Sequence, residues 1–253
     1  MRIFIDSLID DDINATLNSK LFNNKPTDVT SLEVKHTFNI KKLKDVDLNI
    51  YPNITELILH NNYGYNDWID IKDGLIKFSH ITKLTMYNFV IFRGLVFKNY
   101  TKLKMLELYN VNIKNLYFLK YINTLLCLTI GSNILNDMSG IKYLKNLEHF
   151  SYQRHFTCKI DIPILFKNLK TVSIKYFNLH EQELYKLYPF LCSDNLQRFD
   201  VGDETHKSLI YGICHFYNID AFIVSQNWIN WIKYCKMYIA MLHRNKQLEE
   251  LCV

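Results

Sequence analysis

The sequence predicts an α/β solenoid in which short parallel strands line one side and short helices form the return path. Three observations predict this fold. An apolar template of the form L-x-x-L-x-L-x-x-N recurs along the chain, and its copies follow one another at a nearly constant period. Between the copies, apolar residues recur every third residue, which is the period of a 3₁₀ helix rather than of an α-helix.

Nine copies of the template align between residues 29 and 227, and three of them keep the final asparagine, at Asn62, Asn133 and Asn227. The central apolar residues of the copies are Leu32, Leu57, Leu84, Leu106, Leu128, Phe150, Val172, Phe199 and Phe222. The steps between them are 25, 27, 22, 22, 22, 22, 27 and 23 residues. Four consecutive steps of 22 indicate a true repeat, with one strand and one return path in each unit.

Each return path is expected to follow the spacing of its apolar residues. One path carries Ile113, Leu116, Leu119, Ile122 and Leu125, and the next carries Met138, Ile141 and Leu144. This spacing of three predicts 3₁₀ helices. The two longer steps contain residues 63–80 and 178–194, for which we expect α-helical return paths instead.

Residues 103–179 resemble the SDS22-like class of leucine-rich repeats, whose 22-residue unit carries Leu-x-x-Leu-x-Leu-x-x-Asn-x-Ile-x-x-Ile-x-x-Leu. The stretch "LKMLELYNVNIKNLYFLKYIN" departs from this unit only by Val111 at the asparagine position. The resemblance extends over most of residues 29–227. It implies a horseshoe-shaped solenoid with a concave parallel sheet and a convex side of 3₁₀ and α-helices. It says little about function, because repeats of this kind serve many partners.

Both ends of such a solenoid need caps, since the terminal repeats would otherwise expose their core. Residues 1–28 are predicted to form the N-terminal cap, with a helix after Asp10–Asp12, because aspartates at the start of a helix favour its dipole. Residues 228–253 are predicted to form a C-terminal capping helix. Its apolar stripe consists of Trp228, Trp231, Ile232, Cys235, Ile239 and Leu242.

Composition limits the classes of partner. The chain of 253 residues is 49% hydrophobic and 22% charged, and its net charge of +5 comes from 30 basic and 25 acidic residues that are interspersed. This pattern disfavours nucleic acid as a partner, because nucleic-acid binders gather basic residues on one face. No apolar stretch reaches the 18 residues that a membrane span needs.

Six cysteines, scattered without Cys-x-x-Cys or zinc-site spacing, favour a reducing, intracellular compartment. Asn, Ile, Lys, Tyr and Phe are abundant, whereas Ala occurs three times and Arg five times. These abundant residues have AT-rich codons. The sequence therefore favours an AT-rich genome, such as that of a large DNA virus, a protist or a low-GC bacterium, with the host cytoplasm as the location if the source is viral.

The chain lacks the sequence motifs of common enzymes, metal sites and cofactor sites, so we expect a monomeric, non-catalytic protein-binding scaffold with no cofactor. The repeat register predicts which side chains line the concave face. The candidate partner-binding residues are His60, Thr85, Tyr87, Glu107, Tyr109, Thr129, Ser151, Gln153 and Lys175. Tyrosine is enriched in binding hot spots. The alternative is that two of the 17 tyrosines fall on this face by chance.

Two narrower functions stay open at this point. Some leucine-rich-repeat proteins are substrate-recognition adaptors of ubiquitin ligases and carry an N-terminal F-box, but only about 28 residues precede the first repeat here, without the usual Leu-Pro start. The likeness to the SDS22-like class implies a phosphatase regulatory subunit as the other alternative. Fold-level analogy alone supports it.

Overall fold

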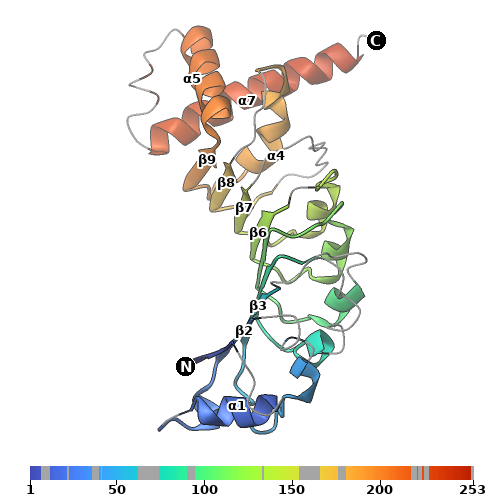
Figure 1. Cartoon of the computed structure of the whole chain (residues 1–253). Helices are drawn as coiled ribbons and strands as arrows, with labels where there is room; N and C mark the ends of the chain where they lie inside the picture. Colours follow the sequence, from blue (N-terminus) through green and yellow to red (C-terminus); the bar gives the residue numbers. More distant parts are fainter. Residues whose placement is uncertain are drawn as a thin grey trace. The chain divides into compact units, whose positions relative to one another are not determined.

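The computed structural model describes residues 1–6, 12–21, 23–35, 40, 42–61, 74–89, 95–132, 134–153, 166–175, 181–217, 221, 224 and 228–251. The chain forms two compact units. Unit 1 comprises Met1–Ile113 and Tyr117–Ile134, and unit 2 comprises Lys114–Leu116 and Leu135–Val253. In each unit, parallel strands lie on one side and helices cover the other (Figure 1).

Unit 1 holds six of the described strands, and they follow one another across the sheet in chain order. They are β1 (Arg2–Ile5), β2 (Ser31–Lys35), β3 (Glu56–His60), β4 (Lys83–Tyr87), β5 (Met105–Tyr109) and β6 (Cys127–Gly131). Each strand is parallel to the next and keeps the same register, so the central template residues lie side by side. The predicted strands from Leu32 to Leu128 are therefore confirmed.

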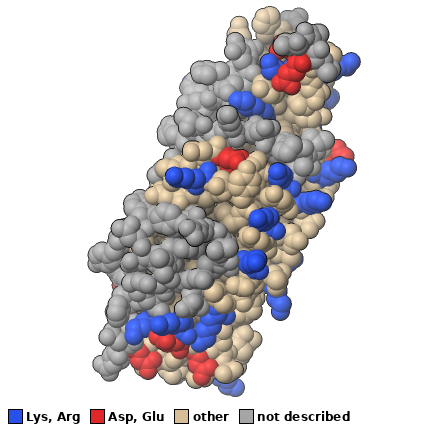
Figure 2. Space-filling view, turned by 90° about the vertical axis from the view of Figure 1, so that its right-hand side faces the viewer, with Lys and Arg blue, Asp and Glu red and all other residues tan. Residues whose placement is uncertain are grey.

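The return paths of unit 1 are short. They contain α1 (Ile13–Ser19), η1 (Pro26–Asp28), η2 (Lys42–Asp45), η3 (Leu95–Asn99) and η4 (Tyr117–Tyr121), where η denotes a 3₁₀ helix. The prediction of 3₁₀ return paths is confirmed by η4, which lies within the run of apolar residues spaced by three. Figure 2 shows the side of the molecule that these helices occupy, with Lys and Arg scattered among uncharged residues.

The core of unit 1 lies between the sheet and these return paths. Leu57, Leu84, Leu106 and Leu128 are completely buried, as the alternation of a half-buried strand requires. On the helical side, the rings of Phe97 and Phe118 stack with centroids 4.7 Å apart. Consecutive repeats thus share one apolar core, and no single repeat could bury its apolar face alone.

Unit 2 continues the same architecture and ends in a larger helical layer. Its strands are β7 (His149–Gln153), β8 (Thr171–Lys175) and β9 (Arg198–Val201), again parallel and in chain order. Its helices are η5 (Ser139–Tyr143), η6 (Glu181–Leu187), α4 (Tyr188–Leu191), α5 (Asp203–Tyr217) and α7 (Trp228–Leu251). The 3₁₀ helix predicted around Ile141 is confirmed by η5. Together these features make the predicted α/β leucine-rich-repeat solenoid.

The helix α7 packs on β9, α4, α5 and η6 at the end of unit 2 (Figure 1). Trp231 is buried and its indole Nε1 donates a hydrogen bond of 2.9 Å to the Phe199 carbonyl of β9. Gly212 of α5 is needed for the close approach of the two helices, because a Cβ there would lie 2.2 Å from the Tyr238 hydroxyl. The predicted helix after residue 228 is confirmed, with Trp231, Ile232, Cys235 and Ile239 on its buried side.

The two ends of the strand array differ from the prediction. The segment predicted as an N-terminal cap contributes a strand, β1, which pairs with β2, and then α1, which Asp12 caps through its carboxylate. The ninth template copy does not form a strand, since Ala221 and Val224 are helical; Phe222, Ile223 and Asn227 lie outside the described residues. A short apolar pattern does not distinguish a strand from a buried helix.

The longer return paths also need correction. Residues 74–77 are helical, and residues 62–73 lie outside the described residues, as does Asn133. Residues 181–187 form the 3₁₀ helix η6 rather than the predicted α-helix, and only Tyr188–Leu191 are α-helical. Pro189 has no backbone N–H, so it cannot donate the hydrogen bond that an α-helix across this point would require.

Candidate partner-binding surface

The strands of unit 1 present three rows of side chains on the side of the sheet away from the helices. The first, third and fifth residues of each strand point to this side, and the parallel register places equal positions next to one another. We call this surface the strand face of unit 1. For β2 to β6, its residues are Ser31, Glu33, Lys35, Glu56, Ile58, His60, Lys83, Thr85, Tyr87, Met105, Glu107, Tyr109, Cys127, Thr129 and Gly131.

Three rings stack along the fifth-position row, and we call them the aromatic row: His60, Tyr87 and Tyr109. The planes of the His60 and Tyr87 rings are nearly parallel, at 1°, with centroids 4.4 Å apart. The Tyr87 and Tyr109 rings lie 4.9 Å apart at 13°. These spacings match the separation of about 4.8 Å between neighbouring strands, so the backbone register itself holds the rings in contact.

Charged groups lie at the His60 end of this row. The Nε2 atom of His60 lies 3.0 Å from the Glu33 Oε1 atom, and both side chains are about one-fifth exposed. The ammonium of Lys35 lies over the Phe4 ring, 4.6 Å from its centroid. The imidazole therefore has both a stacking partner and a polar partner, which fix its orientation.

A charge network of Arg2, Glu33, Glu56, Lys83 and Glu107 crosses the strands beside the aromatic row. Arg2 lies 3.7 Å from Glu33 and 3.1 Å from Glu56. Lys83 lies 2.9 Å from Glu56 and 3.6 Å from Glu107. The hydroxyl of Thr85 donates a hydrogen bond of 2.8 Å to Glu107. Two cations are thus shared among three carboxylates.

Sequence reasoning missed Arg2, Glu56 and Lys83. The template begins its strand at the first inward leucine, whereas the outward residue just before that leucine belongs to the same face. Extending the two-residue alternation by one position toward the N-terminus would have found Glu56 and Lys83. Arg2 required the additional strand β1 to be recognised.

The network sets the protonation of its members. Burial alone would raise the pKa of the Glu56 carboxyl, but hydrogen bonds from Ser31 and Lys83, the charge of Lys83 and a bond from Arg2 hold that pKa below its usual value. Burial alone would lower the pKa of Lys83, but Glu56 and Glu107 raise it above its usual value. Both groups are therefore charged at neutral pH.

The tyrosine hydroxyls and the thiol on this face stay protonated. Burial and the charges of Glu107 and Glu33 raise the pKa of Tyr87. Burial, the Glu107 charge and the neighbouring Tyr87 raise the pKa of Tyr109 to about 12. Burial and the Glu107 charge raise the pKa of the Cys127 thiol to about 11. The face offers neutral hydroxyls for hydrogen bonding, and its thiol is a poor nucleophile because thiolate is the reactive form.

Six of the nine predicted residues lie together on the strand face of unit 1: His60, Thr85, Tyr87, Glu107, Tyr109 and Thr129. Thr85 and Thr129 are only 2% and 7% exposed, and Ile58 on the same face is 7% exposed. These three side chains form the floor of the face. The rings and the carboxylates provide the accessible contact groups.

The other three predicted residues, Ser151, Gln153 and Lys175, lie on the strands of unit 2. Ser151 pairs in register with Ser173, and Gln153 with Lys175. The Gln153 amide donates to the Ser151 hydroxyl at 3.4 Å, and Lys175 is exposed. The equivalent face of unit 2 is thus made of small polar groups and isolated charges, and its described residues form no stack of rings.

No group of three or more His, Cys, Asp or Glu side chains that could hold a metal ion occurs within the described ranges. None of the described helices is both long and apolar enough to cross a membrane.

The sequence matches no protein-family model, and no curated protein matches it. Among solved structures, it is similar to an internalin, inlF, from Listeria monocytogenes, with 16% sequence identity and a TM-score of 0.45. The alignment covers 76% of this chain and 66% of the internalin chain, so the chain spans just under two thirds of that protein's structure.

Proposed function

We propose that this protein is a non-catalytic protein-binding scaffold and that its partner contacts the strand face of unit 1. The aromatic row carries this proposal. Three rings from three separate repeats stack in one line beside a network of charges. Tyrosine combines a large apolar ring with a hydroxyl, and such residues dominate the energy of many protein interfaces.

The rigidity of this face supports the same proposal. Each ring is held by its neighbour on the next strand, and His60 is also held by Glu33. Side chains that are already ordered lose little conformational entropy when a partner binds. The charges beside them provide specificity, because a partner must place groups opposite Glu107 and Lys83 that match their charge.

The proposed location is intracellular. Three cysteines, Cys127, Cys192 and Cys235, are free thiols, and Cys158 and Cys252 lie outside the described residues. Free thiols are typical of a reducing compartment. We also propose that the chain comes from an AT-rich viral genome and therefore acts in the host cytoplasm. This proposal rests on composition alone, because the abundant residues have AT-rich codons.

A pull-down with the full chain from a cell lysate, followed by affinity measurement on the captured partner, tests the proposal. Changing both Tyr87 and Tyr109 to Ala should weaken binding by more than about 2 kcal/mol with little change in melting temperature. Changing both to Phe keeps the stacked rings and separates the role of the rings from that of the hydroxyls. If the protein is a ubiquitin-ligase adaptor, ligase components should be among the captured proteins. If it is a phosphatase regulatory subunit, a phosphatase should be captured.

The matched control changes Lys114 and Lys120, two exposed lysines of the return paths, to Ala. This pair should leave the affinity unchanged. Equal binding by the Tyr87/Tyr109 double variant and the parent protein would reject the strand face as the binding surface.

A further inference from the structure

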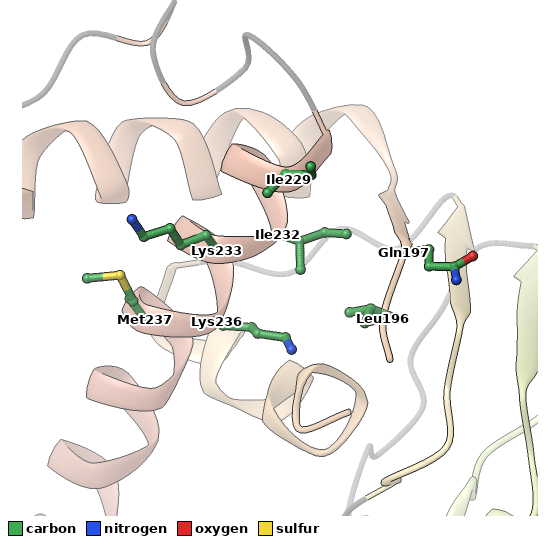
Figure 3. A pocket seen from close by; sticks show the side chains of 7 residues that line it. All are labelled: Leu196, Gln197, Ile229, Ile232, Lys233, Lys236 and Met237. Atoms are coloured by element: carbon green, nitrogen blue, oxygen red, sulfur yellow. The ribbon is translucent and has the colours of Figure 1, made fainter. Parts of the chain in front are cut away.

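Unit 2 contains an apolar groove of about 640 Å³ between α7 and the segment that leads into β9. Its apolar lining comes from Leu196, Ile229, Ile232 and Met237. Figure 3 shows Ile232 and Lys236 projecting from α7 toward Leu196, whereas Lys233 and Met237 project from another side of the helix. The groove therefore lies at the border between the packed side of α7, which contributes Ile232, and its outer side, which contributes Ile229 and Met237.

Two of the four apolar residues of this groove, Ile229 and Met237, are accessible to a partner, whereas Leu196 and Ile232 are 8% and 7% exposed and form its buried floor. Ile229 is 79% exposed and Met237 is 43% exposed, whereas Trp231 and Ile239 on the packed side of α7 are 4% and 0% exposed. The capping helix thus carries apolar residues on two sides but buries one of them. A helix that is apolar on both sides is normally covered on both sides.

The charge of the groove is one-sided. Among the described residues, its lining contains Lys233 and Lys236 and no carboxylate. The Lys236 ammonium donates to the Ser193 carbonyl, which fixes it on the wall next to Leu196. Lys233 is exposed, one turn after Ile229. An apolar floor bordered by ammonium groups favours a ligand whose apolar residues are bordered by carboxylates.

We propose that this groove docks an amphipathic helix of a partner protein, with an apolar stripe flanked by Asp or Glu. The groove residues on α7 extend from Ile229 to Met237, about two helical turns or 12 Å. That length fits the i, i+3, i+4 and i+7 anchors with which an amphipathic helix occupies a groove. This site is separate from the strand face of unit 1 and does not depend on the function proposed above.

A second copy of the chain is a poorer occupant of the same groove. In a two-fold symmetric dimer the same patch meets itself, so residue pairs are exchanged between the copies. Lys233 and Lys236 would then approach the lysines of the other copy with no carboxylate among the groove residues to neutralise them. Like charges in such positions oppose association.

The test uses two designed, fluorescently labelled helical peptides with identical Leu anchors, one flanked by Glu and the other by Lys, and measures their binding to the full chain by anisotropy. The Glu-flanked peptide should bind at least about tenfold more tightly than the Lys-flanked one. Ile229→Glu and Met237→Glu should each weaken its binding about tenfold or more. Lys233→Glu should shift the preference toward the Lys-flanked peptide.

The matched control is Leu248→Glu, which changes a 52% exposed residue on the same helix beyond the groove and should leave the affinity unchanged. Circular dichroism melts of each variant separate loss of binding from loss of folding. Equal binding of the two peptides, no binding of either, or binding insensitive to Ile229→Glu would overturn the proposal. So would a concentration-dependent dimer, seen by sedimentation, that Ile229→Glu abolishes.

Discussion

The two units share one scaffold but display different outer faces. In unit 1 the outward positions hold three stacked rings and a five-residue charge network. In unit 2 the corresponding positions hold serines, a glutamine and the ion pair of Arg198 with Asp200 at 2.7 Å, and a further pair, Lys170 with Glu148 at 2.7 Å, lies just before β7 and β8. The repeat fixes where outward side chains stand, and the residue chosen at each position decides what the face can bind.

The inward positions, by contrast, hold buried apolar residues in both units. Substitutions at these positions should have the largest effects on the free energy of unfolding, and they test whether the two cores are alike. Leu128→Ala in unit 1 and Phe150→Ala in unit 2 both remove completely or almost completely buried side chains. We expect each to lower the free energy of unfolding by about 2–5 kcal/mol, because a cavity remains in a shared core. Urea denaturation of the purified variants measures this loss.

Thr129→Ala is the matched control for Leu128→Ala, one residue along the same strand but on the outer face. It should cost less, since it removes a small side chain from the floor of the face. A larger loss for Thr129→Ala than for Leu128→Ala would mean that the strand register is shifted by one residue. A negligible loss for Phe150→Ala would show that the core of unit 2 is packed less tightly than that of unit 1.

The sequence was sufficient for the core and for most of the strand register, because two-residue alternation and a 22-residue period are direct consequences of strand and repeat geometry. It also placed His60, Tyr87 and Tyr109 on one row. It could not show that their rings stack, since stacking depends on side-chain rotamers, or that Thr85 is buried.

The ends of the array were harder to predict for a physical reason. At the ninth template copy the apolar residue Val224 is buried within helical structure, which its short apolar pattern allows as readily as a strand. At the other end, β1 has only four residues, but Ile3 and Ile5 are buried by pairing with β2. Local patterns therefore fix the middle of a solenoid better than its ends.

A second expected difference between the units concerns the turns after the strands. Asn88 and Asn110 of unit 1 have φ values of 64° and 52°, and no other non-glycine residue in the described ranges has a positive φ. The Asn110 amide donates a hydrogen bond of 2.6 Å to the Asn88 side chain. These two asparagines thus link the turns after β4 and β5.

Asn110→Ala should lower the free energy of unfolding by about 1–2 kcal/mol, because alanine is strained in the left-handed region. Asn110→Gly should cost less, since glycine accepts this conformation and loses only the side-chain bond. Thermal melts of the two variants provide the comparison. An Asn110→Gly variant less stable than Asn110→Ala would show that the hydrogen bond, and not the backbone conformation, explains the asparagine.

The smallest expected effect concerns the charge network that distinguishes unit 1. Lys83→Ala removes the cation between Glu56 and Glu107 and should cost about 1 kcal/mol at neutral pH, a typical value for a partly exposed ion pair. Lys170→Ala is the control in unit 2, where a single exposed pair is lost, and it should cost less. Urea denaturation at neutral and acidic pH measures both.

The pH dependence tests whether Lys83 acts through its charge. The pKa of Glu56 in the folded protein lies below the ordinary 4.5, because the effect of burial is outweighed by hydrogen bonds from Ser31, Lys83 and Arg2 and by the charge of Lys83. The network therefore contributes stability above about pH 4.5, and this contribution disappears as the pH falls through the lower, folded-state pKa. The difference in the free energy of unfolding between the parent protein and Lys83→Ala should accordingly become smaller at acidic pH. If this difference in the free energy of unfolding stayed constant from pH 7 down to about pH 3, Lys83 would stabilise the face through packing of its aliphatic stem. The ion pairs of unit 1 would then contribute no more than the isolated pairs of unit 2.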